Sequence, residues 1–234
     1  MRSLLPLCSS LRNGSGLRVP SSNRTIAGTY IGADGLIHLG TPHKLRPNYV
    51  QNSAGLWVRS GWLREGAATN AFTSQTPTAT DNTITVALDA SAPFGSGIAA
   101  YHIMQVSAGS WKGVGAPASS RSDTAQCSFS FFIRCTVSAY LYLSCISKTN
   151  WSMVFTSGAM TSHDSSLSVQ ALGNSCYRVS AAVTYAQVAA AYIAYYSTNT
   201  DLVNGFWVGG FQAEDTAVSS FIPTTTAAVT RTAD

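Results

Sequence analysis

The stretch TSHDSS (Thr161–Ser166) brings one histidine, one aspartate and three serines within six residues. Serine, histidine and aspartate are the residue types of a nucleophile, its general base and the carboxylate that orients the base. Such catalysis also needs hydrogen-bond donors for an oxyanion, and no glycine motif suited to that task adjoins this polar segment. We therefore interpret His163, beside Asp164, as a solvated side chain and expect no hydrolytic site here.

Acidic residues are few and scattered. Glycoside hydrolysis needs two carboxyl groups that face each other across a cleft. The nine acids after residue 64 are dispersed, and Glu214 and Asp215 are neighbours that a strand would direct to opposite faces. The sequence also has no Walker loop, no HExxH pair and no D-x-D-x-D calcium loop. It therefore predicts no enzyme activity and no cofactor.

The five cysteines are an odd number and include no CxxC pair, so metal-ligand spacing is absent. Cys127, Cys135 and Cys145 lie in or beside strand-like runs and are expected to be small buried apolar residues. One disulfide in oxidising surroundings is the alternative, which we do not favour.

Tryptophans are the remaining candidates for a binding site, because sugars stack their apolar ring faces on aromatic side chains. Trp111 (in AGSWKG) and Trp151 (in KTNWSM) lie in loop-like contexts, whereas Trp207 is in the middle of a strand-like run and is expected in the core. Trp111 and Trp151 are therefore candidate glycan-binding platforms. A packed or interfacial role is the alternative for both.

The elements that must position these residues are strands. Eight segments are rich in β-branched or aromatic residues, most with a period of two, and Gly, Asn, Ser and Pro clusters separate them. They are Thr83–Ala90, Gly97–Ala108, Gln126–Thr136, Ala139–Ser147, Ser166–Gly173, Cys176–Tyr185, Ala189–Tyr196 and Gly205–Gln212. The pattern predicts an all-β fold, an antiparallel jelly-roll β-sandwich preceded by an extended N-terminal arm.

Charge is sparse and uneven along the chain. Only 10% of the 234 residues are charged, against about 25% in typical soluble domains. A neutral surface of this kind favours a subunit packed in an assembly, with a secreted β-domain as the alternative. Residues 1–64 hold eight of the fourteen Lys and Arg but one of the ten acids. We expect residues 1–70 to be a basic arm and leading segment for attachment, and residues 71–234 to be the sandwich with a short C-terminal tail.

The basic leader has no periodic apolar face and is not expected to fold alone. Its candidate attachment residues are Arg2, Arg12, Arg18 and Arg24. No aromatic residue is interleaved with the basic residues of 1–29, which favours an acidic protein surface over nucleic acid as the partner. A tail with no partner is the alternative. The apolar run Leu4–Leu7 is too short for a signal peptide, and no run reaches the roughly 20 apolar residues of a membrane helix, so we expect no membrane insertion.

Six segments are similar to motifs of one known family. They are ADGLI (Ala33–Ile37), LRPNY (Leu45–Tyr49), GWLREGAATN (Gly61–Asn70), SLSVQALGNSCYRVS (Ser166–Ser180), FWVGGFQAEDTAVSSFIPTT (Phe206–Thr225) and VTRTAD (Val229–Asp234). In this order and spacing they resemble a family of bacteriophage head-fibre or tail-fibre proteins, often with a carbohydrate-binding-module-like domain. Two positions depart from the family: LRPNY reverses the usual Pro-Arg order, and Ser175-Cys176 replaces Gly-Trp.

The resemblance implies a structural protein of a bacteriophage virion, assembled in the host bacterial cytoplasm. Its arm would dock on capsid, portal or tail proteins, and its sandwich would project as part of a homo-oligomer, since fibres of this kind are commonly trimers. A tail adhesin that binds host surface polysaccharide is the alternative. Because no receptor-binding tip or enzymatic domain follows the sandwich, attachment and decoration rank above host recognition.

The stretch Phe206–Thr225 begins as a strand and ends in a neutral Ser/Thr segment. In a period-two strand Gln212 and Glu214 share a face and arrive where the strand leaves the sheet. A buried amide and carboxylate at that point bind the backbone of a neighbouring loop. We predict a structural latch of Gln212, Glu214, Thr69 and Asn70, in which Glu214 holds the Glu65–Asn70 turn. A catalytic Glu214 is the weaker alternative.

Overall fold

The computed structural model describes residues 29–40, 46–63, 65, 67–80, 83–105, 109–145, 150–197, 205–215, 217–224 and 226–231. Their regular secondary structure is nearly all β, with 55% in strands and 3% in helix, and the two largest antiparallel sheets pack as a sandwich. The predicted all-β sandwich is therefore confirmed.

Each sheet of the sandwich has six strands, and all neighbouring strands are antiparallel. The first sheet has the order β14 (Ser168–Ala171), β15 (Cys176–Thr184), β10 (Gln126–Cys135), β17 (Phe206–Glu214), β8 (Ala100–Gln105) and β7 (Ile84–Asp89). The second has the order β13 (Ala159–His163), β12 (Trp151–Thr156), β11 (Ala139–Ser144), β16 (Tyr192–Ser197), β9 (Gly109–Gly115) and β6 (Thr78–Ala79).

The connections between the sheets give the jelly-roll order. Going from β8 to β9, β10 and β11, the chain changes sheet at every step, and it does so again from β15 to β16 and β17. The central strands β15-β10-β17-β8 thereby face β12-β11-β16-β9. Two interleaved Greek keys of this kind define a jelly roll, as the sequence predicted.

The main core lies between the two sheets and follows from the period-two pattern. In β10, Phe129, Phe131 and Ile133 point inward and are fully buried, as are Leu141 and Leu143 of β11. Burying each of these side chains stabilises the fold by about 1.5–3 kcal/mol. The alternate residues of the first sheet point away from this core and form what we call the outer face.

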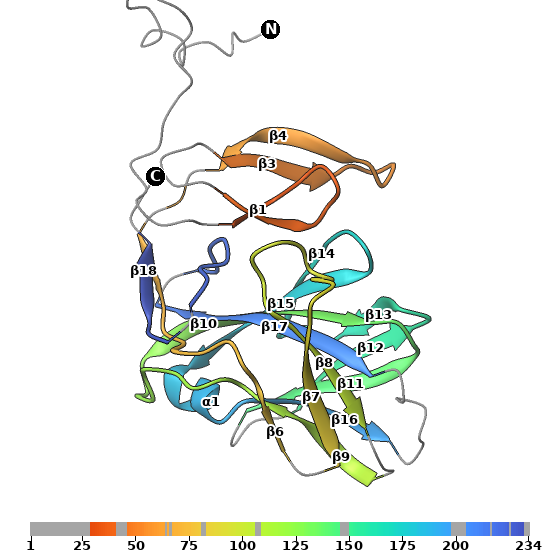
Figure 1. The fold of residues 1–234 in the computed structure, drawn as a ribbon, viewed down its shortest axis with the longest axis vertical. Coiled ribbons are helices and arrows are strands. Elements are labelled where there is room, and N and C mark those ends of the chain that lie inside the picture. Colours follow the sequence, from red (N-terminus) through yellow and green to blue (C-terminus); the bar gives the residue numbers. More distant parts are fainter. Residues whose placement is uncertain are drawn as a thin grey trace, which may run out of the picture.

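A layer of two hairpins lies on the outer face (Figure 1). It consists of β1 (Thr29–Ile31) paired with β2 (Ile37–Leu39), and β3 (Arg46–Gln51) paired with β4 (Trp57–Leu63). We call these four strands the N-terminal layer. These strands fall in the expected arm and leading segment of residues 1–70, and Ile31 and Ile37 bury apolar surface against the sheet. Residues 1–28 lie outside the described residues.

A second, smaller core joins the N-terminal layer to the sandwich. Its buried members are Ile37, Phe94, Ile98, Ala100, Phe132, Leu172, Cys176 and Phe221. The β1–β2 turn also rests on the β14–β15 turn, since the amide of Gly173 donates to the carbonyl of Gly35 at 2.8 Å. Gly35 has a φ of 74° and lies against the Trp57 ring, so glycine suits this position. The layer is thus packed on the sheet at two places.

Three further elements, two short strands and one helix, complete the described fold. The short strands β5 (Ala68–Asn70) and β18 (Val229–Arg231) pair with each other beside the N-terminal layer. The five-residue helix α1 (Tyr185–Ala189) follows β15 directly, where the sequence predicted only strands. No helix among the described residues has the length and hydropathy needed to cross a bilayer.

Candidate functional site

The outer face of the first sheet carries a row of polar side chains. Ser168, Ser180, Ser130 and Gln212 are aligned across β14, β15, β10 and β17. Because residues directly opposite each other share a face of the sheet, this row forms a continuous polar strip. The neighbouring row contains Gln170, Arg178 and Phe132, and it extends the strip with a cation.

Beside this strip, two buried arginines share one carboxylate. The Arg46 and Arg231 side chains are 1% and 0% exposed and lie 3.0 and 2.8 Å from Oε2 of Glu65. The Ser220 hydroxyl donates to that same oxygen at 2.5 Å and accepts from Arg46 and Arg231 at 2.7 and 2.6 Å. We call Arg46, Glu65, Ser220 and Arg231 the arginine cluster. The two guanidinium groups share the Glu65 carboxylate and the Ser220 hydroxyl, so each buried charge has polar partners, as buried ions require.

The arginine cluster also fixes the start of β1. Arg46 donates to the carbonyl oxygen of Thr29 at 2.9 Å, and the Thr29 hydroxyl donates to the carbonyl of Phe221 at 3.0 Å. The described chain therefore begins at Thr29 and reaches its last strand at Arg231 within one network of contacts.

A second buried carboxylate lies next to the cluster. Glu214 is 1% exposed, and its oxygens accept from the Ser219 amide at 2.9 Å, the Ser219 hydroxyl at 2.5 Å and the Gln212 amide at 2.5 Å. Gln212 in turn accepts from the Ile222 amide at 2.7 Å. Gln212 and Glu214 thus hold the segment that follows β17. The hydrogen bonds of the Glu214 carboxylate come from groups of the protein itself.

Two buried amide side chains, those of Asn70 and Gln75, connect β17 to neighbouring segments by hydrogen bonds. Asn70 donates to the carbonyls of Phe211 and Ile222 at 3.0 and 2.9 Å, and it accepts from the Phe72 and Ala213 amides, both at 3.2 Å. All its hydrogen-bonding capacity is therefore used. Gln75 makes a similar set of bonds to Phe211 and to the Thr224 hydroxyl.

The arrangement of the predicted latch differs in one respect from the expectation. Among the described residues, Glu214 accepts from Ser219, whereas Glu65 of the turn accepts from the adjacent Ser220 amide at 2.5 Å. The chain after β17 thus passes between Glu214 and Glu65. Asn70 is buried in the network, whereas Thr69 is exposed and pairs with the Thr230 hydroxyl at 2.7 Å.

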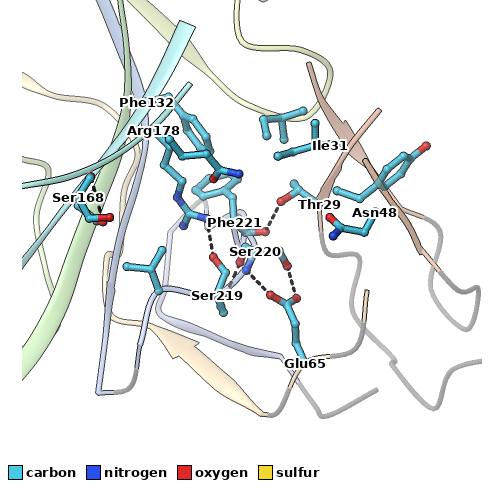
Figure 2. Close-up of a pocket in the computed structure, with 15 residues that line it drawn as sticks. Thr29, Ile31, Asn48, Glu65, Phe132, Ser168, Arg178, Ser219, Ser220 and Phe221 are labelled. Atoms are coloured by element: carbon cyan, nitrogen blue, oxygen red, sulfur yellow. Dashed lines mark hydrogen bonds between the residues drawn. The ribbon is translucent and has the colours of Figure 1, made fainter. Parts of the chain in front are cut away.

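A pocket of about 280 Å³ opens between the N-terminal layer and the polar strip, above these networks (Figure 2). Thr29, Tyr30, Ile31 and Asn48 line it from the layer. The opposite wall belongs to the sheet and includes Ser168, Gln170, Arg178 and Ser180, and Glu65 and Val218–Phe221 lie at the base. Hydroxyl, amide and charged groups therefore share the wall of a small cavity with apolar side chains that include Ile37, Phe132 and Phe221. Such a mixed lining suits a small ligand.

Arg178 is the cation of this pocket. Its guanidinium donates to the Ser219 carbonyl at 2.6 Å and to the Ser130 hydroxyl at 3.0 Å, and it lies over the Phe132 ring at 5.4 Å. Its buried Nε has no hydrogen-bond partner among the described residues. Burial lowers the pKa of Arg178 to about 10, although the charges of Glu214 and Glu65 oppose this effect. Arg178 therefore keeps its charge at neutral pH.

The two candidate tryptophans do not lie in loops, as the sequence suggested, but in strands. Trp111 belongs to β9 and Trp151 begins β12, where it is half-buried and packs against the main core. β9 escaped detection because glycines weaken its pattern. Gly113 is needed there, since a Cβ would collide with the carbonyl of Ile193. Trp207 is half-buried and packs against the smaller core.

The other residues singled out in the sequence lie apart from the pocket. His163 is exposed at the end of β13, with Nδ1 3.0 Å from the carbonyl of Asp164. Arg2, Arg12, Arg18 and Arg24 lie outside the described residues. Within the described ranges, no three His, Cys, Asp or Glu side chains are grouped so that they would hold a metal ion.

No protein-family model matches the chain, and no curated protein matches its sequence significantly. Residues from all six segments named in the sequence analysis lie in or near this site. Each contributes to this site or to the contacts around it: Gly35, Arg46, Glu65 with Asn70, Arg178, Gln212 with Glu214 and Ser220, and Arg231. Arg46, Arg178 and Arg231 were not named as site residues from the sequence, although they lie inside these segments.

Proposed function

We propose that this protein is a structural subunit of a bacteriophage virion, a head-fibre, tail-fibre or decoration protein without enzyme activity. The chain is attached to capsid, portal or tail proteins through the basic segment before β1, and the jelly roll projects from the particle. The virion is accordingly its location.

One observation supports this proposal above the others. Thr29 and Arg231, near the two ends of the described chain, are held at the same pole by the arginine cluster. The jelly roll extends from that pole (Figure 1). A module held at one pole presents the rest of its surface outward, as an attached decoration must.

Replacing Arg2, Arg12, Arg18 and Arg24 together by Gln tests the attachment. We expect the variant to fold with an unchanged melting temperature but to be lost from purified virions, measured by quantitative immunoblotting and immunogold electron microscopy. Arg59→Gln, in β4, is the matched control and should be incorporated normally. Normal incorporation of the fourfold variant would refute attachment through these arginines, and failure to find the wild-type protein on virions would refute the virion role.

We further propose that the subunit is a homotrimer with contacts through the N-terminal layer. Among the described residues six large hydrophobic side chains are exposed, and four of them lie in or beside β2, β3 and β4: Leu39, Val50, Leu56 and Val58. Val50 and Val58 are direct cross-strand partners, so they form one continuous apolar patch. Light scattering coupled to size exclusion should give three times the chain mass, and Val50→Lys with Val58→Glu should give monomers. A monomeric wild type would contradict the trimer.

A glycan-binding role is the second candidate, and the pocket of Figure 2 favours it. Its polar lining resembles what sugar hydroxyls require, whereas Trp151 packs against the core and does not offer a free platform. Screening the full chain against bacterial surface polysaccharides tests this role. Binding that persists in Trp111→Ala and Trp151→Ala would place recognition elsewhere than at the tryptophans, and no binding to any polysaccharide would exclude the role.

A further inference from the structure

A second pocket, of about 330 Å³, is formed by three segments that lie far apart in the sequence. They are residues 74–76 before β6, residues 97–101 around the start of β8, and residues 221–224 between β17 and β18. Phe221 borders both this pocket and the one in Figure 2. None of the described residues that line the second pocket carries a charge. A charged ligand would lose its hydration there without gaining an ionic partner, so the lining favours a neutral molecule.

One part of the second pocket is apolar. Ala99 and Tyr101 both line it, because residues two apart in an extended chain point to the same side. Leu88, the cross-strand partner of Tyr101, is 66% exposed, so apolar surface continues from Tyr101 onto β7. Pro223 lines the pocket from the segment after β17. An aromatic ring and a proline ring in one small cavity suit the apolar face of a ring compound.

The Thr224 hydroxyl in this lining is held by a buried amide. Gln75 donates to Thr224 Oγ1 at 2.7 Å. The backbone of Phe211 in turn fixes Gln75, since it accepts from the amide nitrogen at 3.0 Å and donates to the amide oxygen at 2.8 Å. Because the Thr224 oxygen is the acceptor in its bond with Gln75, its own O–H remains able to donate. Thr224 thus offers a hydroxyl donor whose oxygen has a fixed position.

Two further hydroxyl donors belong to the lining. The Ser74 hydroxyl accepts from the Thr76 amide at 3.0 Å and keeps its own hydrogen. The hydroxyls of Thr76 and Tyr101 share one hydrogen bond at 2.8 Å, and whichever of them accepts keeps its hydrogen. The described lining therefore combines three O–H donors with an apolar wall. A sugar matches both, because it has oxygen acceptors around its ring and C–H groups on its ring faces.

We propose that the second pocket binds one neutral sugar residue, free or at the end of a glycan, with a ring face against Tyr101 and its oxygens on the three hydroxyl donors. The volume of about 330 Å³ lies at the lower end of small-molecule pockets, which suits a single sugar residue. The proposal rests on the glycan-binding role above and names a site and a ligand class for it. It does not depend on attachment through the basic segment.

Ala99 provides a variant that fills the cavity. It is half-buried and lines the pocket, so the larger side chain of Ala99→Leu would take the place of the sugar. Ser96→Leu is the matched control, because Ser96 lies three residues earlier, is exposed and does not line the pocket. Ser74→Ala is a second variant, which removes one hydroxyl donor without filling the cavity.

The experiment is an NMR titration of the full chain with glucose, galactose, mannose and N-acetylglucosamine, with glucuronate as the charged comparison and melting temperatures as the check on folding. We expect at least one neutral sugar to shift the amide signals of residues 74–76 and 97–101. Ala99→Leu should weaken its binding at least about tenfold, or 1.4 kcal/mol, whereas Ser96→Leu should bind as the wild type does. Ser74→Ala should weaken it by about threefold to tenfold, through the loss of one hydrogen bond.

Several outcomes would overturn the inference. Glucuronate that binds as tightly as glucose would show that the pocket does not select a neutral ligand. Unchanged affinity in a folded Ala99→Leu would place the sugar elsewhere. No binding of the four neutral sugars, or shifts confined to other residues, would also exclude this site. A positive polysaccharide screen would then show that the glycan-binding role stands at another site, and a negative screen would exclude both.

Discussion

Ser175 is a residue whose backbone conformation conflicts with its side chain. Asn174 and Ser175 have φ values of 59° and 55° in the turn between β14 and β15. Asparagine tolerates this left-handed region, but serine loses about 1–2 kcal/mol there. We predict that Ser175→Gly stabilises the protein by about 0.5–1 kcal/mol, because glycine removes the strain at some cost in unfolded-state entropy.

Urea unfolding measures this gain. Ser166→Gly is the matched control: Ser166 is exposed and does not have a positive φ, so glycine should lower stability there. If Ser175→Gly also lowers stability, the strain at residue 175 is not relieved by glycine, and the account is wrong.

The buried cysteines give a prediction about pH. Cys127, Cys135, Cys145 and Cys176 are free and buried, and desolvation raises the thiol pKa of Cys127 to about 12 and of Cys145 to about 11. The thiolate is the reactive form, so these sites should resist iodoacetamide at pH 8 in the native protein and react after unfolding. Peptide mapping by mass spectrometry follows each cysteine separately. Rapid native labelling of Cys145 would contradict its burial.

The same raised pKa values affect stability at alkaline pH. A thiol near its usual value of about 8.5 ionises in the unfolded chain, while the folded chain keeps Cys127 and Cys145 protonated. The contribution of these two thiols to the free energy of unfolding is fully present below about pH 8.5. It is lost as pH rises through their raised pKa values of about 11 and 12. Cys145→Ala should therefore flatten the decline of the free energy of unfolding above pH 9.

At the scale of elements, helix α1 depends on a capping box. The Thr184 hydroxyl accepts from the Gln187 amide at 3.3 Å, and the Gln187 side chain accepts from the Thr184 amide at 2.9 Å. We predict that Thr184→Ala costs about 1 kcal/mol of stability, because an N-cap acceptor is lost. Thr184→Ser retains the hydroxyl and should cost less in the same denaturant experiment. Equal losses for both variants would argue that the methyl group, and not the cap, matters.

The elements also show what the sequence could predict. In AYLYLSC (Ala139–Cys145), a period of two places Leu141, Leu143 and Cys145 on one face of a strand, and all three are buried in the main core. Such alternation depends only on neighbours along the strand, so it is visible in a single sequence. Helix α1 was not predicted because its few residues lie between strand-like runs, and the Thr184–Gln187 pair is its one local signal.

At the scale of the whole molecule, the N-terminal layer depends on the arginine cluster. Glu65 forms ion pairs with both Arg46 and Arg231, and removing one member of a buried ion pair costs about 3–5 kcal/mol. We predict that Glu65→Gln lowers the free energy of opening of the layer by about this amount. Hydrogen exchange with mass spectrometry should show faster exchange in β3 and β4, while β10 stays protected by the main core on its other face.

A surface pair provides the control for this prediction. Asp123 binds Arg121 at 2.9 Å, but both side chains are substantially exposed, so Asp123→Asn should leave the exchange of the layer unchanged. Uniformly faster exchange in β10 and β17 of Glu65→Gln would mean that the layer and the jelly roll open as one unit.

The site itself was predicted only in part, for reasons of distance along the chain. Gln212, Glu214 and Asn70 were expected in a polar network because amides and a carboxylate follow an apolar strand. The partners of Glu65 could not be derived in this way: Ser220 is 155 residues away, and no local pattern indicates which arginines reach the carboxylate. The role of Arg178 could not be predicted either. The sequence pattern places Arg178 on a strand, but it does not show that the N-terminal layer lies opposite it.

The contacts of Thr29 and Arg231 have a mechanical consequence. Tension applied to the chain at Thr29 acts first on β1 and on its bond to Arg46. Glu65 and Ser220 then pass the load to Arg231, at the same pole. This path is short, so tension between Thr29 and Arg231 would act on the arginine cluster before it acts on the strands of the jelly roll.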